Sequence, residues 1–544
     1  MKVITIASVL ALAAAAAQAD PLLTSWYTAN SSTLARVIQT VSTTTPTVNT
    51  TPTTTWPTSG ITNNNTGGLA VTTPVFADVQ RIRYDASWVY VNSSGLASYT
   101  MGPFLTKTAG SLFGFWPVSQ NYTCKLPRTP GAVPTNKAAH AGGLIGMMVN
   151  GVGIYDLGDA FGFVQTASSP VTGSDAMGNT NATHPWWRDA LAVEVVTFDP
   201  GFAHQPGING QYHYHAEPKA LRYQLGDNMQ ATYDAVNHTY SYTEDTSNLH
   251  HSPILGWSFD GYPIYGPYGY STPMDPNSAV TRMRSGFVLC NGSNGTTNIN
   301  STSRTRLPKW AAIAEGFATL ANYSTQTLSN GDFVLSAATL YGPTTTYTTT
   351  GPQGATFSLG RYIGDYDFLG DRGQTQGPAG TFDLDQYNGR NCVTPEFPGG
   401  TYAYFVTIDV SGNPAFPYML GKQYYGTKTG TTQAVTVPTS GVTEYFNAGG
   451  ANLAERWSGA PAVNSGNGNV TITWSSVEGG TYKVEATTNL SAAPIVWTTV
   501  NASVPAPANT VIPQPATVIN KTSLTDPAAT SASPKKFYRV SRNP

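Results

Sequence analysis

Cysteine is scarce in this 544-residue chain, which contains only Cys124, Cys290 and Cys392. Three cysteines allow at most one disulfide within the chain, and none of them forms the close CxxC pair that builds cysteine zinc sites. A disulfide scaffold and a cysteine-ligated zinc domain are therefore excluded. We expect the three thiols to be structural or inert.

Charge and long apolar runs are also scarce. Charged residues make up 11% of the chain, against about 25% in a typical soluble domain, and the formal net charge is −2. Such a chain has no long-range field that would attract nucleic acid or an anionic membrane. No run of about 18 apolar residues follows the N-terminal segment, so we expect no membrane span.

The N-terminal segment has the pattern of an export signal. Lys2 supplies a positive charge, Val3–Ala16 is nearly all apolar, and Ala17-Gln18-Ala19 fits the small-x-small cleavage pattern. A signal peptide over residues 1–19 predicts a secreted, periplasmic or cell-surface protein whose mature chain begins near Asp20.

Glycine, proline and tyrosine are abundant, at 54, 38 and 30 residues. These residues favour turns and strands, so we expect a mainly β fold with few short helices. Strands are predicted over Ser87–Val91 and Leu191–Phe198, and a hairpin over Gly146–Tyr155 is predicted to turn at Asn150-Gly151. A helix is predicted over Lys309–Glu315, where a proline precedes strong helix formers.

Composition divides the mature chain into four parts. Residues 20–77 are rich in Ser, Thr, Pro and Asn and contain too few apolar groups to pack. Residues 78–427 are expected to form a large β-rich domain, and residues 428–440 a linker. Residues 441–544 contain short alternating strands typical of a β-sandwich, and this tail resembles the fibronectin-like modules of secreted bacterial proteins.

The segment GQYHYHAEP at 210–218 is the most informative part of the chain. Successive side chains of a strand point to opposite faces, so Tyr212 and Tyr214 share one face while His213 and His215 share the other. Residues two apart in a strand have Cα atoms about 6–7 Å apart, so two such imidazoles can converge on a single ion. We therefore expect His213 and His215 to be metal ligands.

A metal site needs further ligands, and the neighbouring sequence supplies candidates. His204 precedes the Tyr-His segment and His251 follows it, while Glu217 and Asp260 are candidate ligands or general bases. Imidazole binds zinc, copper, nickel and iron, so one zinc or copper ion is the expected cofactor. Alternatively, the histidines are structural and form hydrogen bonds to loops.

The tyrosines allow a different function. Tyr262 and Tyr265 lie in a stiff aromatic segment that could stack on a surface glycan or contact a protein partner, and Tyr212 and Tyr214 are further binding candidates. The C-terminal module is a second candidate site for such a partner. Alternatively, these rings cover the core of a β-rich domain, which is the commoner role of aromatic residues.

Calcium is a weaker expectation. Asp383–Gly389 reads DLDQYNG and is similar to the start of a calcium loop, but the bidentate glutamate at the twelfth position is missing. Aspartates in such a segment more often cap turns and pair with neighbouring arginines.

Several segments together resemble the YHYH-domain family over residues about 80–426. They include GLIGMMVNGVGIYD, GFAHQPGINGQYHYHAEP, HSPILGWSFDGYPIYGPYGY and DLDQYNGRNCVTPEFPGGTYAYFVTID. The resemblance implies an exported, often surface-associated protein, and it supplies no activity. The family's motif falls on Tyr212–His215.

One departure from the family pattern bears on function. The resemblance implies a second Tyr-His-Tyr-His near the end of the domain, where Gly400–Phe405 reads GTYAYF. If the two strands bound a metal jointly, this chain would have lost half of the ligands. The sequence therefore leaves three functions open: a metal-binding protein with or without catalysis, a cell-surface or matrix-binding protein, and a structural scaffold.

Overall fold

The structure, a computed structural model, describes residues 20–28, 35–37, 77–104, 116–168, 171–178, 186–207, 209–234, 239–316, 323–335, 342, 359–447, 456–457, 462–464, 469–476, 481–492, 495–505, 520–530 and 536–542. The predicted signal peptide and nearly all of the Thr-rich segment lie outside these residues. The fold contains 40% strand and 10% helix, so the predicted mainly β class is confirmed. Within the described residues, no helix has the length and apolar character needed to cross a membrane.

The chain forms two compact units. The larger comprises Ser25–Ala454 with Ala508–Ile519, and the smaller comprises Glu455–Pro507 and Asn520–Pro544 together with Met1–Thr24. The histidine-rich segment belongs to the larger unit.

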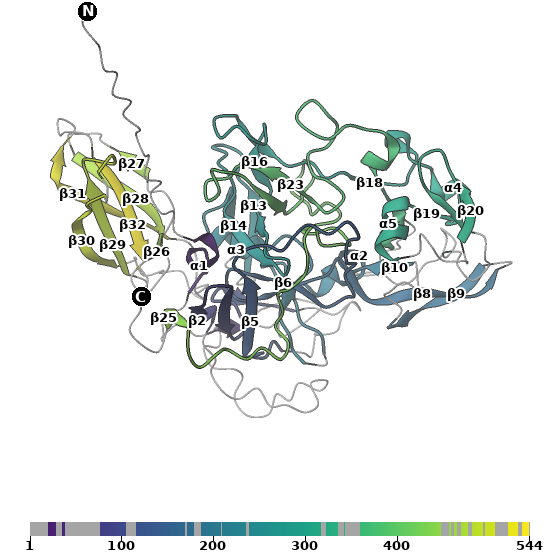
Figure 1. Cartoon of the computed structure of the whole chain (residues 1–544), viewed down its shortest axis with the longest axis horizontal. Coiled ribbons are helices and arrows are strands. Elements are labelled where there is room, and N and C mark those ends of the chain that lie inside the picture. The colour runs from purple at the N-terminus through teal and green to yellow at the C-terminus, as the bar shows by residue number, and fades with distance from the viewer. Residues whose placement is uncertain are drawn as a thin grey trace, which may run out of the picture. The chain divides into compact units, whose positions relative to one another are not determined.

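A seven-stranded sheet is the largest sheet of the larger unit. Its strands β6, β14 and β23 are labelled in Figure 1. Two neighbouring pairs, β11–β7 and β15–β24, are parallel, and the other neighbours are antiparallel. Most of its residues are buried, as expected for a sheet that is covered on both faces. In spatial order its strands are β11 (His213–Tyr214), β7 (Gly153–Tyr155), β6 (Leu144–Met148), β14 (Ile254–Ser258), β15 (Pro263–Tyr265), β24 (Thr401–Phe405) and β23 (Gly389–Cys392).

The hairpin between β6 and β7 turns where the sequence predicted. Gly151 has a φ of 78°, and a Cβ atom there would lie 2.4 Å from Cβ of Ser93. Only glycine satisfies both the left-handed backbone and the close approach. The predicted strand near Ser87–Val91 is likewise confirmed as β3 (Trp88–Ser93), and the predicted helix as α5 (Lys309–Ala314).

The predicted strand over Leu191–Phe198 is wrong. The segment forms helix α2 (Ala190–Glu194) followed by the 3-10 helix η1 (Val195–Thr197). Asp189 starts the helix because its carboxylate accepts a hydrogen bond from the backbone N–H of Ala192. As a helix, this segment places the side chain of Glu194 beside His204 and His215.

Smaller sheets complete the larger unit. A four-stranded sheet has the order β25 (Thr443–Asn447), β2 (Val79–Tyr84), β3 and β5 (Tyr122–Pro127), so the strand that follows the expected linker pairs with β2. Two three-stranded sheets have the orders β10 (Trp187–Asp189), β8 (Gly158–Ser168), β9 (Val171–Met177), and β19 (Arg306–Leu307), β21 (Phe333–Leu335), β20 (Tyr323–Thr327). The two-stranded pairs are β1 (Arg36–Val37) with β4 (Thr100–Met101), β12 (Met229–Asp234) with β13 (Thr239–Glu244), β16 (Tyr268–Tyr270) with β17 (Val280–Arg282), and β18 (Phe287–Leu289) with β22 (Tyr366–Phe368).

The remaining helices are short. Alongside α2, α5 and η1, the described residues form α1 (Pro21–Thr24), α3 (Lys219–Gln224), α4 (Ile299–Thr302), η2 (Ser293–Gly295), η6 (Ile363–Asp365) and η7 (Leu369–Arg372). Helix α5 buries Trp310 in a hydrophobic cluster with Trp186, Trp187 and Phe416. Full burial of such large apolar side chains contributes about 1.5–3 kcal/mol each.

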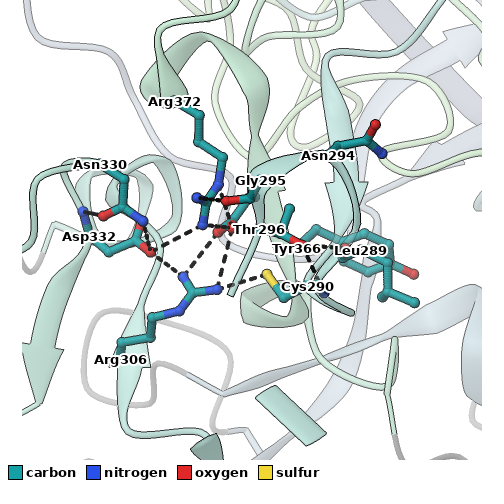
Figure 2. A network of polar contacts seen from close by, with 12 residues as sticks. Leu289, Cys290, Asn294, Gly295, Thr296, Arg306, Asn330, Asp332, Tyr366 and Arg372 are labelled. Carbon is teal, nitrogen blue, oxygen red and sulfur yellow. Dashed lines mark hydrogen bonds and ion pairs between the residues drawn. The ribbon is translucent and has the colours of Figure 1, made fainter. Parts of the chain in front are cut away.

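A buried ion network ties distant segments of the larger unit together (Figure 2). Arg306 of β19 donates hydrogen bonds to Asp332 and Asp367, and Arg372 donates to Asp367 as well. The Sγ atom of Cys290 lies 2.9 Å from a guanidinium nitrogen of Arg306. Two guanidinium groups thus balance two carboxylates, which removes the cost of leaving either sign buried alone.

All three cysteines are buried free thiols. Burial raises the pKa of the Cys124 and Cys290 thiols well above the usual value. Because the thiolate is the reactive form, neither group is set up as a nucleophile.

The smaller unit consists of two sheets around a common core. One sheet has the order β26 (Arg456–Trp457), β32 (Phe537–Arg542), β29 (Thr481–Thr487), β30 (Thr498–Pro505), and the other has β27 (Ala462–Asn464), β28 (Asn469–Ser476), β31 (Asn520–Thr530). Ile472 and Trp474 of β28 share one hydrophobic cluster with Tyr482 and Val484 of β29. Inner faces of two packed sheets therefore form this core, as in a β-sandwich.

Candidate metal centre

Three histidines converge at the β11 edge of the seven-stranded sheet. One nitrogen from each of His204, His213 and His215 lies within 4.8 Å of the others. The three residues are 5%, 2% and 3% exposed, respectively. The backbones of His204 and His213 exchange two hydrogen bonds of 3.2 and 2.8 Å, which fixes the loop histidine beside the strand histidines.

Each ring is oriented by a hydrogen bond at its Nδ1 atom. The Nδ1 atom of His213 lies 2.7 Å from the carbonyl of Gln211, and that of His215 lies 2.6 Å from the carbonyl of Asp156. The Nδ1 atom of His204 lies 2.6 Å from the hydroxyl oxygen of Thr197. Carbonyl oxygens only accept, so the Nδ1 atoms of His213 and His215 carry the proton.

The Nδ1 atom of His204 is also the protonated nitrogen of its ring. The Thr197 hydroxyl donates to the carbonyl of Glu194, so its oxygen is left to accept from the Nδ1 atom of His204. All three rings then present Nε2 lone pairs to one point, and the Nε2 atoms of His213 and His215 are 2.9 Å apart. Two facing lone pairs repel each other unless a proton or a cation lies between them.

Glu194 is the fourth group of this centre. One of its carboxylate oxygens lies 3.4 Å from Nε2 of His204 and 3.2 Å from Nε2 of His215. Burial opposes its charged form, but hydrogen bonds and charge from the two histidines outweigh burial and hold the pKa of Glu194 well below its usual range. Its side chain is 21% exposed, so the carboxylate stands on the side of the centre that meets solvent.

The two strand histidines titrate differently in the absence of an ion. Burial and the charges of its two neighbours hold the pKa of His213 well below the usual value. Burial acts in the same direction on His215, but the hydrogen bond and charge of Glu194 prevail and raise its pKa. A proton on His215 is therefore the alternative to a cation at this point.

Aromatic rings enclose the imidazoles. Tyr155 stacks on His213 with ring centroids 3.7 Å apart and an interplanar angle of 19°. Phe198 meets His204 edge to face at 4.6 Å. The predicted division of faces also holds, because Tyr212 and Tyr214 point away from the histidines and both bond to the hydroxyl of Tyr99.

Two of the other predicted site residues lie outside the group of three. Glu217 is fully buried and accepts a hydrogen bond from Arg222, while burial raises the pKa of Glu217 to about 7. His251 lies with Tyr265 and Tyr270, at centroid distances of 5.2 and 4.8 Å. Burial lowers the pKa of His251 to about 4, so this imidazole is neutral near pH 7.

The remaining candidates lie in the β14–β15 hairpin, in the middle of the sheet. Asp260 is in the turn between β14 and β15, where it accepts hydrogen bonds from the Tyr404 hydroxyl at 2.6 Å and the Gly426 amide at 2.9 Å. Tyr265 is fully buried, and Tyr262 is half-buried. The tyrosines therefore contribute to the core more than to the surface.

The aspartates of the predicted calcium loop bind other groups of the protein. Asp383 pairs with Arg284 at 2.8 Å, and Asp385 accepts hydrogen bonds from the Tyr402 hydroxyl and the Gly389 amide. These are the turn-capping and pairing roles that aspartates usually have.

Sequence reasoning missed Glu194 and Thr197. Both lie in Leu191–Phe198, the segment predicted to be a strand, where Glu194 interrupts a run of apolar residues. The signal was Asp189, a helix-capping residue directly before Ala190–Glu194.

The cap of α2 leads to a prediction about pH. Burial raises the pKa of Asp189 to about 7, although hydrogen bonds from the Tyr418 hydroxyl and the Ala192 amide oppose the shift. The pKa of an aspartate in an unfolded chain is about 3.9. The folded state therefore holds the proton more tightly, and the stabilisation present below about pH 4 is lost as the pH rises through about 7. We expect Asp189→Asn to flatten the decline of Tm between pH 5 and pH 8, and an unchanged decline would contradict the assignment.

The fold and the site together define a mainly β protein with a buried histidine–carboxylate centre. A family model described as YHYH protein matches residues 123–418, which is more than half of the chain. The chain therefore belongs to the YHYH protein family. No curated protein and no solved structure matches it.

Proposed function

We propose that this protein binds one transition-metal ion through His204, His213 and His215, with Glu194 as the fourth ligand. The observation that carries the proposal is the orientation of three Nε2 lone pairs toward one buried point. In metal sites the ligating histidine commonly donates its other ring N–H to a carbonyl, carboxylate or hydroxyl, which fixes the tautomer. His213 and His215 have carbonyl partners, and His204 has a hydroxyl.

The donor set favours zinc or copper. Three imidazoles and one carboxylate suit zinc, copper, iron and nickel, whereas calcium takes six to eight oxygen ligands. No sulfur ligand lies in the group of three, so selection of copper(I) by soft ligands is not supported. Because Glu194 is the exposed ligand, exchange with water or another small ligand would occur on its side.

Elemental analysis of protein purified without an affinity tag tests the proposal. We expect one equivalent of zinc or copper per chain after exposure to either ion and removal of the excess. The His213→Ala/His215→Ala double variant should contain none, because a pair of ligands from one strand is lost. Retained metal is measured by mass spectrometry and referred to protein concentration.

A matched control is available within the chain. His250 and His251 are adjacent histidines outside the group of three, so a His250→Ala/His251→Ala double variant should keep the full equivalent. Equal loss in both double variants, or an empty wild-type protein, would contradict the proposal.

A further inference from the structure

The two central hairpins of the seven-stranded sheet have the same register. In β6–β7, Leu144 faces Tyr155, the register then shifts, and Gly146 faces Ile154. In β14–β15, Ile254 faces Tyr265, the register shifts at the same point, and Gly256 faces Ile264. Each residue of the first hairpin thus has a counterpart 110 positions later, and the sequences share Gly, Gly, Ile and Tyr at matching positions.

The contact between the hairpins has the same symmetry. Strand β6 pairs with β14 so that Met147 faces Trp257, with Gly146 opposite Ser258 and Met148 opposite Gly256. Exchanging the two hairpins leaves this pairing unchanged. A local two-fold axis therefore passes between Met147 and Trp257.

The third strand of each half follows the same rule. Strand β11 joins β7 in parallel with Tyr214 opposite Ile154, and β24 joins β15 in parallel with Tyr404 opposite Ile264. The segment Tyr212–His215 therefore corresponds to Tyr402–Phe405. His213 and His215 have Ala403 and Phe405 as their counterparts.

The turns that precede these strands also match. The backbone N–H of Asp199 donates to the carbonyl of Ala203, and the Asp199 carboxylate accepts from the Ala203 amide and the Tyr212 hydroxyl. Asp385 makes the same three contacts with Gly389 and Tyr402. The residue that follows each turn pairs with the Tyr-rich strand of its own half. His204 pairs with His213, and Arg390 pairs with Ala403. Arg390 is thus the counterpart of His204.

We infer that the sheet is built from two copies of one unit, and that the second copy keeps the metal cradle with the guanidinium of Arg390 in place of the ion. Arg390 is only 4% exposed and lies over the ring of Phe405 at 5.4 Å, and it donates to the carbonyl of Tyr270. The ring centroids of Tyr265 and Phe405 are 5.7 Å apart and those of Tyr155 and His215 are 5.6 Å apart, although the first pair is stacked and the second meets edge to face. A fixed side-chain cation therefore occupies the place where the first copy gathers ligands for a soluble one.

The second copy also retains a spare donor. The Nε2 atom of His251 is buried without a hydrogen-bond partner among the described residues, and its ring lies 6.3 Å from Phe405. Histidines in place of Arg390, Ala403 and Phe405 would, together with His251, surround one point with four nitrogen donors. The part of this inference that concerns metal rests on the proposed function.

A graft tests the inference. The Arg390→His/Ala403→His/Phe405→His triple variant is expected to bind two equivalents of zinc instead of one. Combined with His213→Ala/His215→Ala, it should bind one. The control carries Arg390→Gln, Ala403→Ser and Phe405→Leu, which disturb the same buried positions without adding ligands, and it should stay at one equivalent. A folded triple variant that stays at one would overturn the second cradle, whereas zero equivalents in the wild type would overturn the first site alone.

The reverse exchange tests the equivalence of the two cradles independently, even if the grafted variant does not fold. His204→Arg, His213→Ala and His215→Phe place the second copy's residues in the first cradle. We expect this variant to melt at a higher temperature than His213→Ala/His215→Ala and to be unaffected by a chelator. A Tm no higher than that of the double variant would show that the two cradles are not equivalent.

Discussion

Replacing Arg222 by methionine is expected to destabilise the larger unit by about 3–5 kcal/mol, since it leaves buried carboxylates without their counterion. Arg222 is fully buried and donates to Asp227 at 2.6 Å, to Glu244 at 2.6 and 2.9 Å, and to Glu217. The side chains of Glu217 and Asp227 have no exposed surface from which water could replace the guanidinium. Whole domains are stable by only about 5–15 kcal/mol, so the variant should approach the limit of folding.

The same substitution at an exposed pair provides the control. Arg81 pairs with Glu444, and the two side chains are 40% and 29% exposed. Exposed pairs contribute about 0–1 kcal/mol, so Arg81→Met should change the free energy of unfolding by no more than that. Urea denaturation of the three proteins checks the difference, and similar midpoints for Arg222→Met and Arg81→Met would contradict the role assigned to Arg222.

Removal of the bound ion is expected to lower stability by a similar amount. A ligand that binds only the folded state, held at 1,000 times its dissociation constant, stabilises by about 4 kcal/mol. We therefore expect a chelator to lower the Tm of the wild-type protein by several degrees, with recovery when zinc or copper is restored. Without the ion, the Nε2 atoms of His213 and His215 face each other at 2.9 Å, and only a proton on His215 remains to separate the two lone pairs.

The double variant separates this effect from general chelator sensitivity. His213→Ala/His215→Ala should show one Tm, unchanged by chelator or by added metal, because the lone pairs that require an ion are gone. A chelator response of equal size in this variant would place the ion elsewhere. Differential scanning calorimetry measures both proteins under the same conditions.

Part of the site could be predicted because it depends on local geometry. The two-residue period of a strand placed His213 and His215 together and Tyr212 and Tyr214 opposite them, whatever the rest of the chain does. The turn at Asn150-Gly151 was predictable for the same reason, since a left-handed glycine is a local requirement.

The rest depends on which loops meet, and no local pattern encodes that. His204 and His251 flank the Tyr-His segment in the sequence, yet only His204 pairs with β11. Glu194 was not predicted as a ligand, because its apolar neighbours favoured a strand. Asp189 instead caps this segment as a helix. The repeat was hidden because insertions of different length separate its parts, so the hairpins recur after 110 residues and the Tyr-rich strands after 190.

The order of the strands also shows whether the segments at 212–215 and 402–405 lie close enough to bind one metal jointly. Four strands, β7, β6, β14 and β15, lie between β11 and β24. The two Tyr-rich strands therefore do not form one site, and alanine and phenylalanine at 403 and 405 remove nothing from the three histidines.

The free thiols have a practical consequence for anyone who handles this protein. Cys124, Cys290 and Cys392 are each buried and unbridged, so the native chain contains no covalent cross-link to be formed or reshuffled. Thiol oxidants, disulfide isomerases and glutathione buffers therefore have no disulfide step to assist when this chain is folded.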